Sequence, residues 1–147
     1  MKRTLIIIAS VALVIFLIVR MIVVQSNRQD EVRRVFVSKL DYDFSTVVDS
    51  VALFAPQVPV GLIYFEYADS TLGNREKKIS RRVTKKGERY RFLVSRGRRY
   101  EIFSKDAREF KAGDSLYINT AEDRMRLRRG GKLVHEFVIS ETIRTDD

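Results

Sequence analysis

Residues 113–116 read Gly-Asp-Ser-Leu, a pattern shared with a group of serine esterases and lipases in which the serine is the nucleophile. Serine becomes nucleophilic only beside a base. The chain has one histidine, His135, and the residue three positions before it is Lys132, whereas the esterases have an aspartate there. Their serine also begins a larger α/β domain, whereas Ser115 lies late in a strand-rich chain. We therefore predict that residues 113–116 form a turn before a β-strand and that Ser115 is not catalytic.

The other residue types that could do chemistry are scattered. His135 falls in a predicted strand without other metal-ligating residues nearby, so a structural or solvent-facing role is expected. The chain has no cysteine, which excludes disulfides, thiolate-bound zinc and cysteine nucleophiles. Acidic residues such as Asp41 and Asp43 fall in predicted loops, where nothing marks them as an acid–base pair. The sequence predicts a protein that is not an enzyme and needs no metal or cofactor.

The strongest chemical feature is positive charge between residues 75 and 99. Twelve Lys or Arg residues occur there against Glu76 and Glu88, a local net charge of +10 in a chain whose total is +9. Such a segment attracts polyanions with a strong salt dependence. The predicted polyanion-binding residues are Arg75, Lys77, Lys78, Arg81, Arg82, Lys85, Lys86, Arg89, Arg91, Arg98 and Arg99.

Aromatic residues alternate with these cations around Tyr90 and Phe92. Proteins that bind single-stranded nucleic acid combine basic grooves with exposed aromatic rings on which bases stack. In a strand, however, Tyr90, Phe92 and Val94 share one face, and Arg89 and Arg91 share the other. We therefore expect the rings in the core and the cations on the surface.

An apolar N-terminal segment precedes the strand-rich, basic part of the chain and is expected to position it. From Thr4 to Val24 every residue is apolar or small except Arg20. At about 1.5 Å per residue this segment is long enough for the hydrocarbon core of a bilayer. Arg20 lies near the end of the helix, where its side chain can reach the headgroups. The sequence predicts a transmembrane anchor over residues 1–24.

Two alternatives concern this anchor. The first is a cleaved signal peptide, for which the only acceptable cleavage site, Val24-Gln25-Ser26, lacks the usual pair of small residues. The second concerns orientation, that is, whether the domain after the anchor lies outside or inside the cytoplasm. Lys2 and Arg3 favour an N-terminus inside the cytoplasm, but the other flank, from Arg28 to Lys39, is also basic. We expect an uncleaved anchor in the bacterial cytoplasmic (inner) membrane, with the following domain outside the cytoplasm.

After the anchor, helical spacing of Val32, Val35, Phe36 and Leu40 predicts a juxtamembrane helix or stalk over residues 25–43. Short runs rich in Val, Ile, Phe and Tyr then predict strands, and residues 104–112 are expected to form one short helix. The predicted strands cover 44–54, 61–68, 77–84, 89–94, 99–103 and two in 125–139, joined by turns at Lys86-Gly87, 95–98 and Gly130-Gly131.

These elements predict a mainly-β domain over residues 44–141, a small antiparallel barrel or sandwich of about seven or eight strands with one short helix. Residues 142–147 are expected to be a disordered tail. The chain as a whole is thus predicted to be an N-terminal transmembrane helix followed by this domain.

Three segments together resemble a known kind of protein. They are Arg89-Tyr-Arg-Phe, Ala112-Gly-Asp-Ser-Leu-Tyr, and the run from Met125-Arg-Leu-Arg-Arg-Gly-Gly-Lys to Phe137. Over residues 89–139 the chain resembles small, uncharacterised membrane-anchored β-domain proteins common in the Bacteroidetes. That family has no established activity, so the resemblance implies an architecture and no site.

The leading hypothesis is a non-catalytic, single-pass protein that presents a basic binding or scaffolding module in the bacterial cell envelope. Its expected partners are the lipid bilayer and an anionic envelope component or an acidic protein; nucleic acid is not expected on that side of the membrane. The alternative is a cytoplasm-facing module that binds nucleic acid or anionic lipid through the basic segment 75–99.

Overall fold

The computed structural model describes the backbone of residues 2–84 and 88–146 and the side chains of residues 10–84 and 88–145. The chain divides into two compact units, Met1–Glu31 and Val32–Asp147. One helix, α1 (Lys2–Leu40), supplies the whole described part of the first unit and the first residues of the second.

Within the first unit, α1 exposes large apolar side chains. Val11 is 54% exposed, Phe16 61% and Ile22 59%. Water is a poor environment for such a surface, whereas the hydrocarbon core of a bilayer accommodates it. Ser10–Leu40 form a helix long and apolar enough to cross a membrane. The expected apolar N-terminal helix is therefore confirmed.

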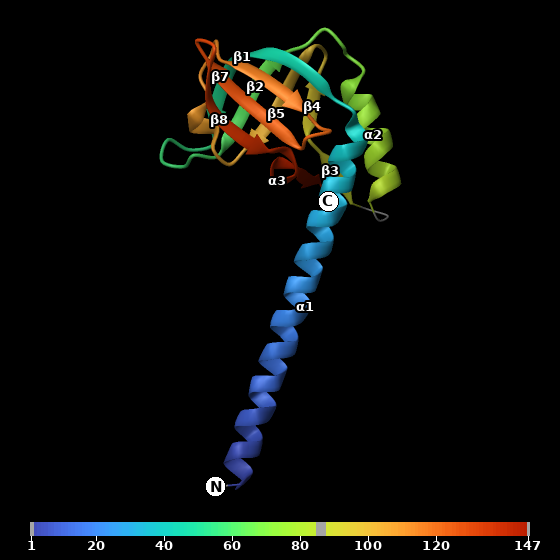
Figure 1. Ribbon diagram of the computed structural model, residues 1–147, viewed down its shortest axis with the longest axis vertical. Helices are drawn as coiled ribbons and strands as arrows, with labels where there is room; N and C mark the ends of the chain where they lie inside the picture. Colours follow the sequence, from blue (N-terminus) through green and yellow to red (C-terminus); the bar gives the residue numbers. More distant parts are fainter. Residues whose placement is uncertain (1, 85–87, 147) are drawn as a thin grey trace. The chain divides into compact units, whose positions relative to one another are not determined.

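The second unit is a mainly-β domain, as predicted (Figure 1). Seven strands form one antiparallel sheet in the order β4-β5-β2-β1-β6-β7-β8, and β3 pairs with β9 in a second, small sheet. Since β4 and β8 end that order, the described strands form an open, sandwich-like sheet and do not close into a barrel. The strands are β1 (Asp43–Leu53), β2 (Gly61–Glu66), β3 (Arg89–Arg91), β4 (Leu93–Arg96), β5 (Arg99–Ser104), β6 (Ser115–Asn119), β7 (Arg124–Arg129), β8 (Lys132–Val138) and β9 (Arg144–Asp146); the helices are α2 (Leu72–Val83), the 3-10 helix η1 (Ala107–Glu109) and α3 (Ile139–Thr142).

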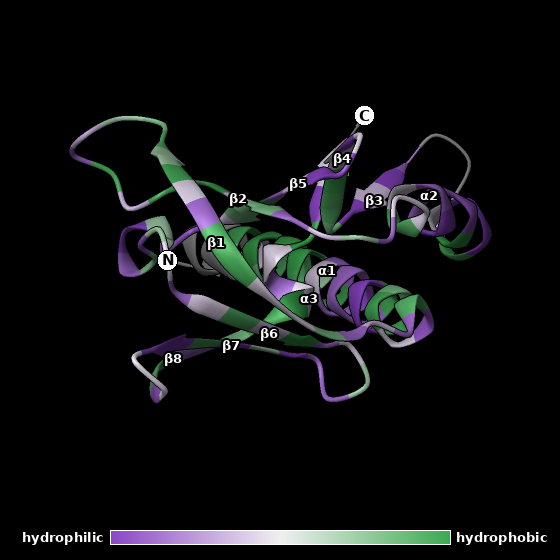
Figure 2. Cartoon of the chain, turned by 90° about the horizontal axis from the view of Figure 1, so that it is seen from above, coloured by the Kyte–Doolittle hydropathy of each residue, from purple (hydrophilic) through white to green (hydrophobic). Residues whose placement is uncertain are grey.

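The long strand β1 joins the two halves of the sheet. Residues Asp43–Val47 pair with β6, and Val48–Leu53 pair with β2 across a bulge between Val48 and Ser50. A bulge increases the local twist and bend of a strand. In Figure 2, β2 and β5 accordingly lie on one side of β1, and β6, β7 and β8 lie on the other.

The last turns of α1 belong to the core of the domain. Phe36, Val37 and Leu40 have no exposed surface, and the Phe36 ring packs edge-on against Tyr90 at 5.8 Å. The helix ends at Leu40 because Asp41 adopts a left-handed conformation, with φ 54°, which a short polar side chain tolerates. Residues predicted as a stalk therefore contribute packing to the β domain.

The turns expected at glycine residues are present where the structure describes them. Gly130 and Gly131 have φ values of 56° and 80° between β7 and β8, as a tight two-residue turn requires. Gly97 has φ 72° in the turn between β4 and β5. The turn predicted at Lys86-Gly87 lies outside the described residues.

The strand predicted over residues 77–84 is wrong, because Leu72–Val83 form helix α2. The apolar residues Leu72, Ile79 and Val83 are spaced by seven and four, which is helical spacing. Glu76 and Ser80 complete the same buried face. Because two positions on that face are polar, the helical periodicity is not apparent from the hydrophobic residues alone.

Three smaller predictions also need correction. The helix expected over residues 104–112 is only the single turn η1, Ala107–Glu109. The strand expected over residues 89–94 is interrupted at Phe92, where the chain leaves β3 and enters β4. The tail expected to be disordered contains β9, whose backbone pairs with β3. The edge of β3 offers unpaired backbone groups, and β9 satisfies them.

Candidate functional site

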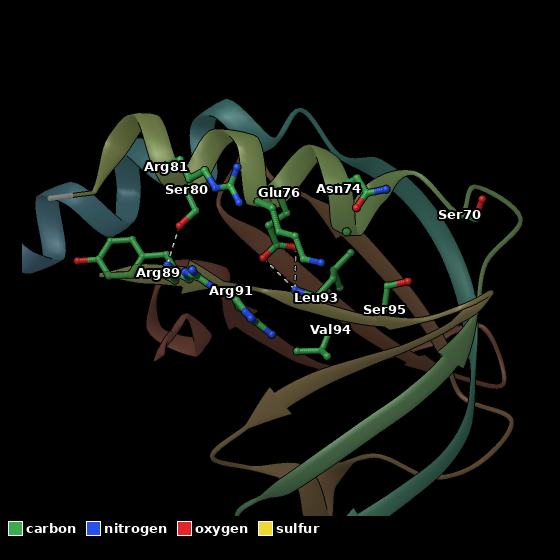
Figure 3. Close-up of a pocket in the computed structure, with 13 residues that line it drawn as sticks. Ser70, Asn74, Glu76, Ser80, Arg81, Arg89, Arg91, Leu93, Val94 and Ser95 are labelled. Carbon is green, nitrogen blue, oxygen red and sulfur yellow. Dashed lines mark hydrogen bonds between the residues drawn. The ribbon is translucent and has the colours of Figure 1, made fainter. Parts of the chain in front are cut away.

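A pocket of about 270 Å³ lies between α2 and the chain that passes from β3 into β4 (Figure 3). Four of the eleven predicted polyanion-binding residues line it, and so does Glu76, which is 2% exposed and the most buried of the described acidic side chains. Its lining residues are Ser70, Gly73, Asn74, Glu76, Lys77, Ser80, Arg81, Arg89, Tyr90, Arg91, Leu93, Val94 and Ser95.

Two polar side chains of α2 bind the backbone of the opposite segment. The Glu76 carboxylate accepts a hydrogen bond from the N–H of Phe92 through Oε1, and both its oxygens lie 3.1 Å from the N–H of Leu93. One turn later, the Ser80 hydroxyl accepts the N–H of Tyr90 at 2.8 Å. Glu76 and Ser80 are four residues apart, so they project from the same face of α2.

The interruption at Phe92 explains why these N–H groups need side-chain acceptors. Strand β3 pairs with β9, whereas β4 pairs with β5. A strand that changes partners leaves amides without a ladder neighbour, and a buried amide without an acceptor is costly. Glu76 supplies the acceptor at this junction.

Burial dominates the electrostatics of Glu76. Removal from water raises the pKa of its carboxyl to about 8, although the amides of Phe92 and Leu93 and the charge of Arg91 lower it. The protonated form is therefore the main form near neutral pH. A neutral carboxyl adds little negative charge to the pocket.

Four cations line the same pocket as this carboxyl, and Arg91 among them lowers its pKa. Lys77 and Arg81 come from α2, and Arg89 and Arg91 come from β3. In the part of the chain whose side chains are described, Lys77, Arg81 and Arg89 form no ion pair. The pocket thus combines a mostly neutral interior with a positively charged rim, which favours an anionic ligand.

Helix α2 approaches β4 closely at the other end of the pocket. A Cβ atom on Gly73 would lie 2.9 Å from the Cβ of Ser95, closer than side chains tolerate. Glycine at this position therefore permits the approach that closes the pocket at Asn74 and Ser95.

The remaining predicted basic residues lie elsewhere or outside the described residues. Arg75 is 3.8 Å from the carboxylate of Asp41 and lies over the ring of Tyr42. Lys78 and Arg82 are exposed on α2 but do not line the pocket. Arg98 is exposed in the β4–β5 turn, and Arg99 donates to Ser50 at 3.1 Å. Lys85 and Lys86 lie outside the described residues.

The aromatic residues among the cations are not available for stacking. Tyr90 is 3% exposed and Phe92 is 2% exposed, as the alternation of residues predicted. Arg89 on the neighbouring position is exposed. This part of the surface presents cations without aromatic platforms.

Ser115 and His135 lie on separate strands and opposite faces. Ser115 begins β6 beside the buried Leu116, so its side chain points away from the core. His135 lies on β8 with its ring 4.3 Å from that of the buried Phe137, two residues along the same face. The turn residue Asp114 is engaged by Arg129, through two contacts of 2.7 Å each. Arg129 lowers the pKa of this carboxyl.

Sequence reasoning missed Glu76 and Ser80, because Glu76 entered only as a counter-charge within the basic segment. The available signal was the spacing of Leu72, Glu76, Ser80 and Val83, which a helical interpretation of the segment would have placed on one face. In comparisons with protein-family models, curated proteins and solved structures, none matched this chain.

Proposed function

We propose that the chain is a single-pass membrane protein of the bacterial cell envelope, whose β domain binds an anionic component through the pocket between α2 and β3–β4 without catalysis. The observation that carries this proposal is the group of cations on the pocket rim, of which Lys77, Arg81 and Arg89 have no acidic partner among the described side chains. Cations around a cavity attract anions and steer them inward.

The anchor follows from α1, whose exposed apolar surface suits a bilayer. The bacterial assignment follows from the resemblance over residues 89–139 to membrane-anchored proteins of the Bacteroidetes. Lys2 and Arg3, which precede the apolar helix, support the extracytoplasmic position of the domain, since positive residues beside a first helix favour the inside of the membrane.

A binding measurement tests the proposed function. Full-length protein in detergent is titrated with polyphosphate at increasing salt, and binding should weaken steeply as salt rises. The variant Arg81→Glu/Arg89→Glu should lose binding. The control Lys105→Glu/Lys132→Glu changes the net charge equally at exposed residues outside the pocket and should bind nearly as well. Equal loss in both variants would show that net charge alone, and not the pocket, attracts polyanions.

A topology measurement tests the compartment. Alkaline phosphatase, which is active only after export, is fused after Asp147. Activity of the fusion supports an extracytoplasmic domain, and an inactive fusion with cytoplasmic fluorescence from a matched reporter contradicts it. In that case the second candidate function, contact with nucleic acid or anionic lipid in the cytoplasm, would follow from the net charge of +10 over residues 75–99.

A further inference from the structure

The pocket has two chemically different ends. In Figure 3, Arg81 and Ser80 on α2 and Arg89 on β3 lie toward one end of the pocket, while Asn74, Ser70 and Ser95 lie toward the opposite end. One end is cationic and the other carries amide and hydroxyl groups. A matching ligand would have an anionic group joined to an uncharged, hydroxylated body.

The cationic end suits a phosphate better than a single negative charge. Arg81 and Arg89 approach from two different elements, and Lys77 adds a third charge. A guanidinium group donates two parallel hydrogen bonds to phosphate oxygens, and a lysine contributes a compact charge. A phosphate monoester carries close to two negative charges at neutral pH, so it can use several cations at once.

The uncharged end suits hydroxyl groups. The Asn74 side chain offers both a donor and an acceptor, and it is exposed at the pocket. The Ser95 hydroxyl donates to the Gly97 carbonyl at 3.1 Å, which leaves its oxygen able to accept. Leu93 and Val94 line the space between the ends and provide an apolar surface for the carbon atoms of a small polyol, and the charged Arg91 side chain reaches toward Val94 in Figure 3.

Size and stacking exclude larger ligands of the same charge. The volume of about 270 Å³ is slightly below the typical range of ligand pockets, about 300–1,000 Å³. A nucleotide would also need an aromatic surface for its base, and Tyr90 and Phe92 are buried. The pocket is therefore matched in size to a sugar phosphate or a glycerol phosphate.

We propose that this pocket binds a phosphate monoester of a small polyol, with the phosphate at Arg81 and Arg89 and the hydroxyl groups at Asn74 and Ser95. The proposal rests on the proposed function, since it names the class of anion that the same site takes. The monoester can be a free small molecule or the end group of an envelope glycoconjugate, and both present the same chemistry to the pocket.

Calorimetric titration of the full-length protein in detergent tests this proposal. Glycerol 3-phosphate and glucose 6-phosphate should bind about tenfold more tightly than inorganic phosphate, because their hydroxyl groups also bind Asn74 and Ser95. Glucose should not bind, because the charged contacts contribute most of the affinity. Equal affinity for inorganic phosphate and both esters overturns the assignment of the polyol end. Absence of binding by all the phosphates overturns the proposal.

Variants assign the two ends separately. Arg81→Gln/Arg89→Gln should abolish phosphate binding, whereas Asn74→Ala should remove the preference for the esters and leave inorganic phosphate unchanged. Lys78→Gln/Arg82→Gln is the matched control, since these cations lie on α2 outside the pocket.

Hydrogen exchange locates the site independently of the variants. Exchange of the backbone amides in α2 and β3 should slow on addition of glucose 6-phosphate. Unchanged exchange in a folded protein that binds the ester would place the site elsewhere and contradict the proposal.

The two proposals fail in different ways. If polyphosphate binding depends on Arg81 and Arg89 but no small phosphate binds, the polyanion-binding function stands and the monoester proposal falls. If neither probe depends on these residues, both fall. To separate the sources of the monoester, two compounds are each tested as competitors of polyphosphate binding: glucose 6-phosphate in solution and an anionic glycolipid that ends in a phosphate monoester. Competition by each compound shows that both sources fit the pocket. Competition by neither contradicts the site.

Discussion

Both oxygens of the Glu76 carboxyl group lie 3.1 Å from the backbone N–H of Leu93, and Oε1 also accepts the N–H of Phe92. This contact joins α2 to the point where the chain changes from β3 to β4. The same side chain forms part of the pocket. The stability of the domain and the shape of its candidate binding site are therefore linked through one residue.

Replacement of Glu76 separates its hydrogen bonds from its charge. Glu76→Ala leaves two buried amides without an acceptor and should lower the free energy of unfolding by about 2–4 kcal/mol. Glu76→Gln keeps a carbonyl oxygen in the position of Oε1 and should cost less than about 1 kcal/mol at neutral pH. Urea denaturation of the full-length protein in detergent measures both. A Gln variant as unstable as the Ala variant would show that an ionised carboxylate is needed to hold α2, which would contradict the protonated form of Glu76 at neutral pH.

The raised pKa of Glu76 predicts a dependence of stability on pH. Burial raises the pKa to about 8 from its ordinary value of 4.5. Between these values the folded state holds a proton that the unfolded state releases, so the free energy of unfolding falls as pH rises from about 5 to 8 and levels off above. The decrease should be on the order of a few kcal/mol. Urea denaturation at pH 5.5, 7 and 8.5 measures it.

The variant Glu76→Gln is the control for this pH dependence, because it cannot titrate. Its free energy of unfolding should vary much less over the same interval. The carboxyls with lowered pKa values, those of Asp69, Asp114 and Glu136, change charge below this interval and do not obscure it. A wild-type protein whose stability is constant from pH 5.5 to 8.5 would contradict the protonated state of Glu76.

Much of the fold could be predicted because its strands carry local signals. The β7–β8 hairpin is marked by Gly130 and Gly131, both of which need positive φ. The buried alternation in β2, with Ile63 and Phe65 inward, follows from period-two hydrophobicity. Helix α2 was missed because two of its inward positions are the polar Glu76 and Ser80. Their burial depends on the amides of a distant segment, which the local pattern does not contain.

The site was predictable only in part. Charge along the sequence pointed to residues 75–99, but the helix distributes these cations differently from the strand that was expected. Lys77 and Arg81 line the pocket, whereas Lys78 and Arg82 lie outside it. The partner change at Phe92 that creates the opposite wall depends on β9. That pairing joins residues far apart in sequence.

The Asp114–Arg129 pair fixes the turn before β6. Asp114 is 3% exposed, and Arg129 also donates to the carbonyl of Glu109 at 2.9 Å. Asp114→Ala should therefore lower the free energy of unfolding by about 2–4 kcal/mol, because a partly buried guanidinium loses its partner. The control Arg128→Ala alters an exposed neighbour and should change stability by less than about 0.5 kcal/mol. Thermal unfolding followed by circular dichroism compares them; equal melting temperatures would contradict this role.

Gly61 permits the close approach of β1 and β2. A Cβ atom at this position would lie 2.4 Å from the backbone oxygen of Ala52. Gly61→Ala should therefore displace one strand and cost about 1–3 kcal/mol. Ser45→Ala, at an exposed position of β1, is the control and should be nearly neutral. A stable Gly61→Ala protein with unchanged hydrogen exchange in β1 would show that this close approach is not required.

The end of α1 should be as important to the domain as any strand. Phe36 has no exposed surface and contacts Tyr90, whose N–H binds Ser80 of α2. Phe36→Ala should therefore cost about 3–5 kcal/mol, because it leaves a cavity beneath β3. Val35→Ala is the matched control, since Val35 is 40% exposed on the same turn and should cost less than about 1 kcal/mol. Urea denaturation of the two full-length variants in detergent measures the difference.

The cavity should also loosen the wall that carries Arg89, so Phe36→Ala is expected to weaken polyphosphate binding at a urea concentration where the variant remains folded. A Phe36→Ala protein as stable as Val35→Ala would mean that the helix ends before the domain and contributes no packing to it.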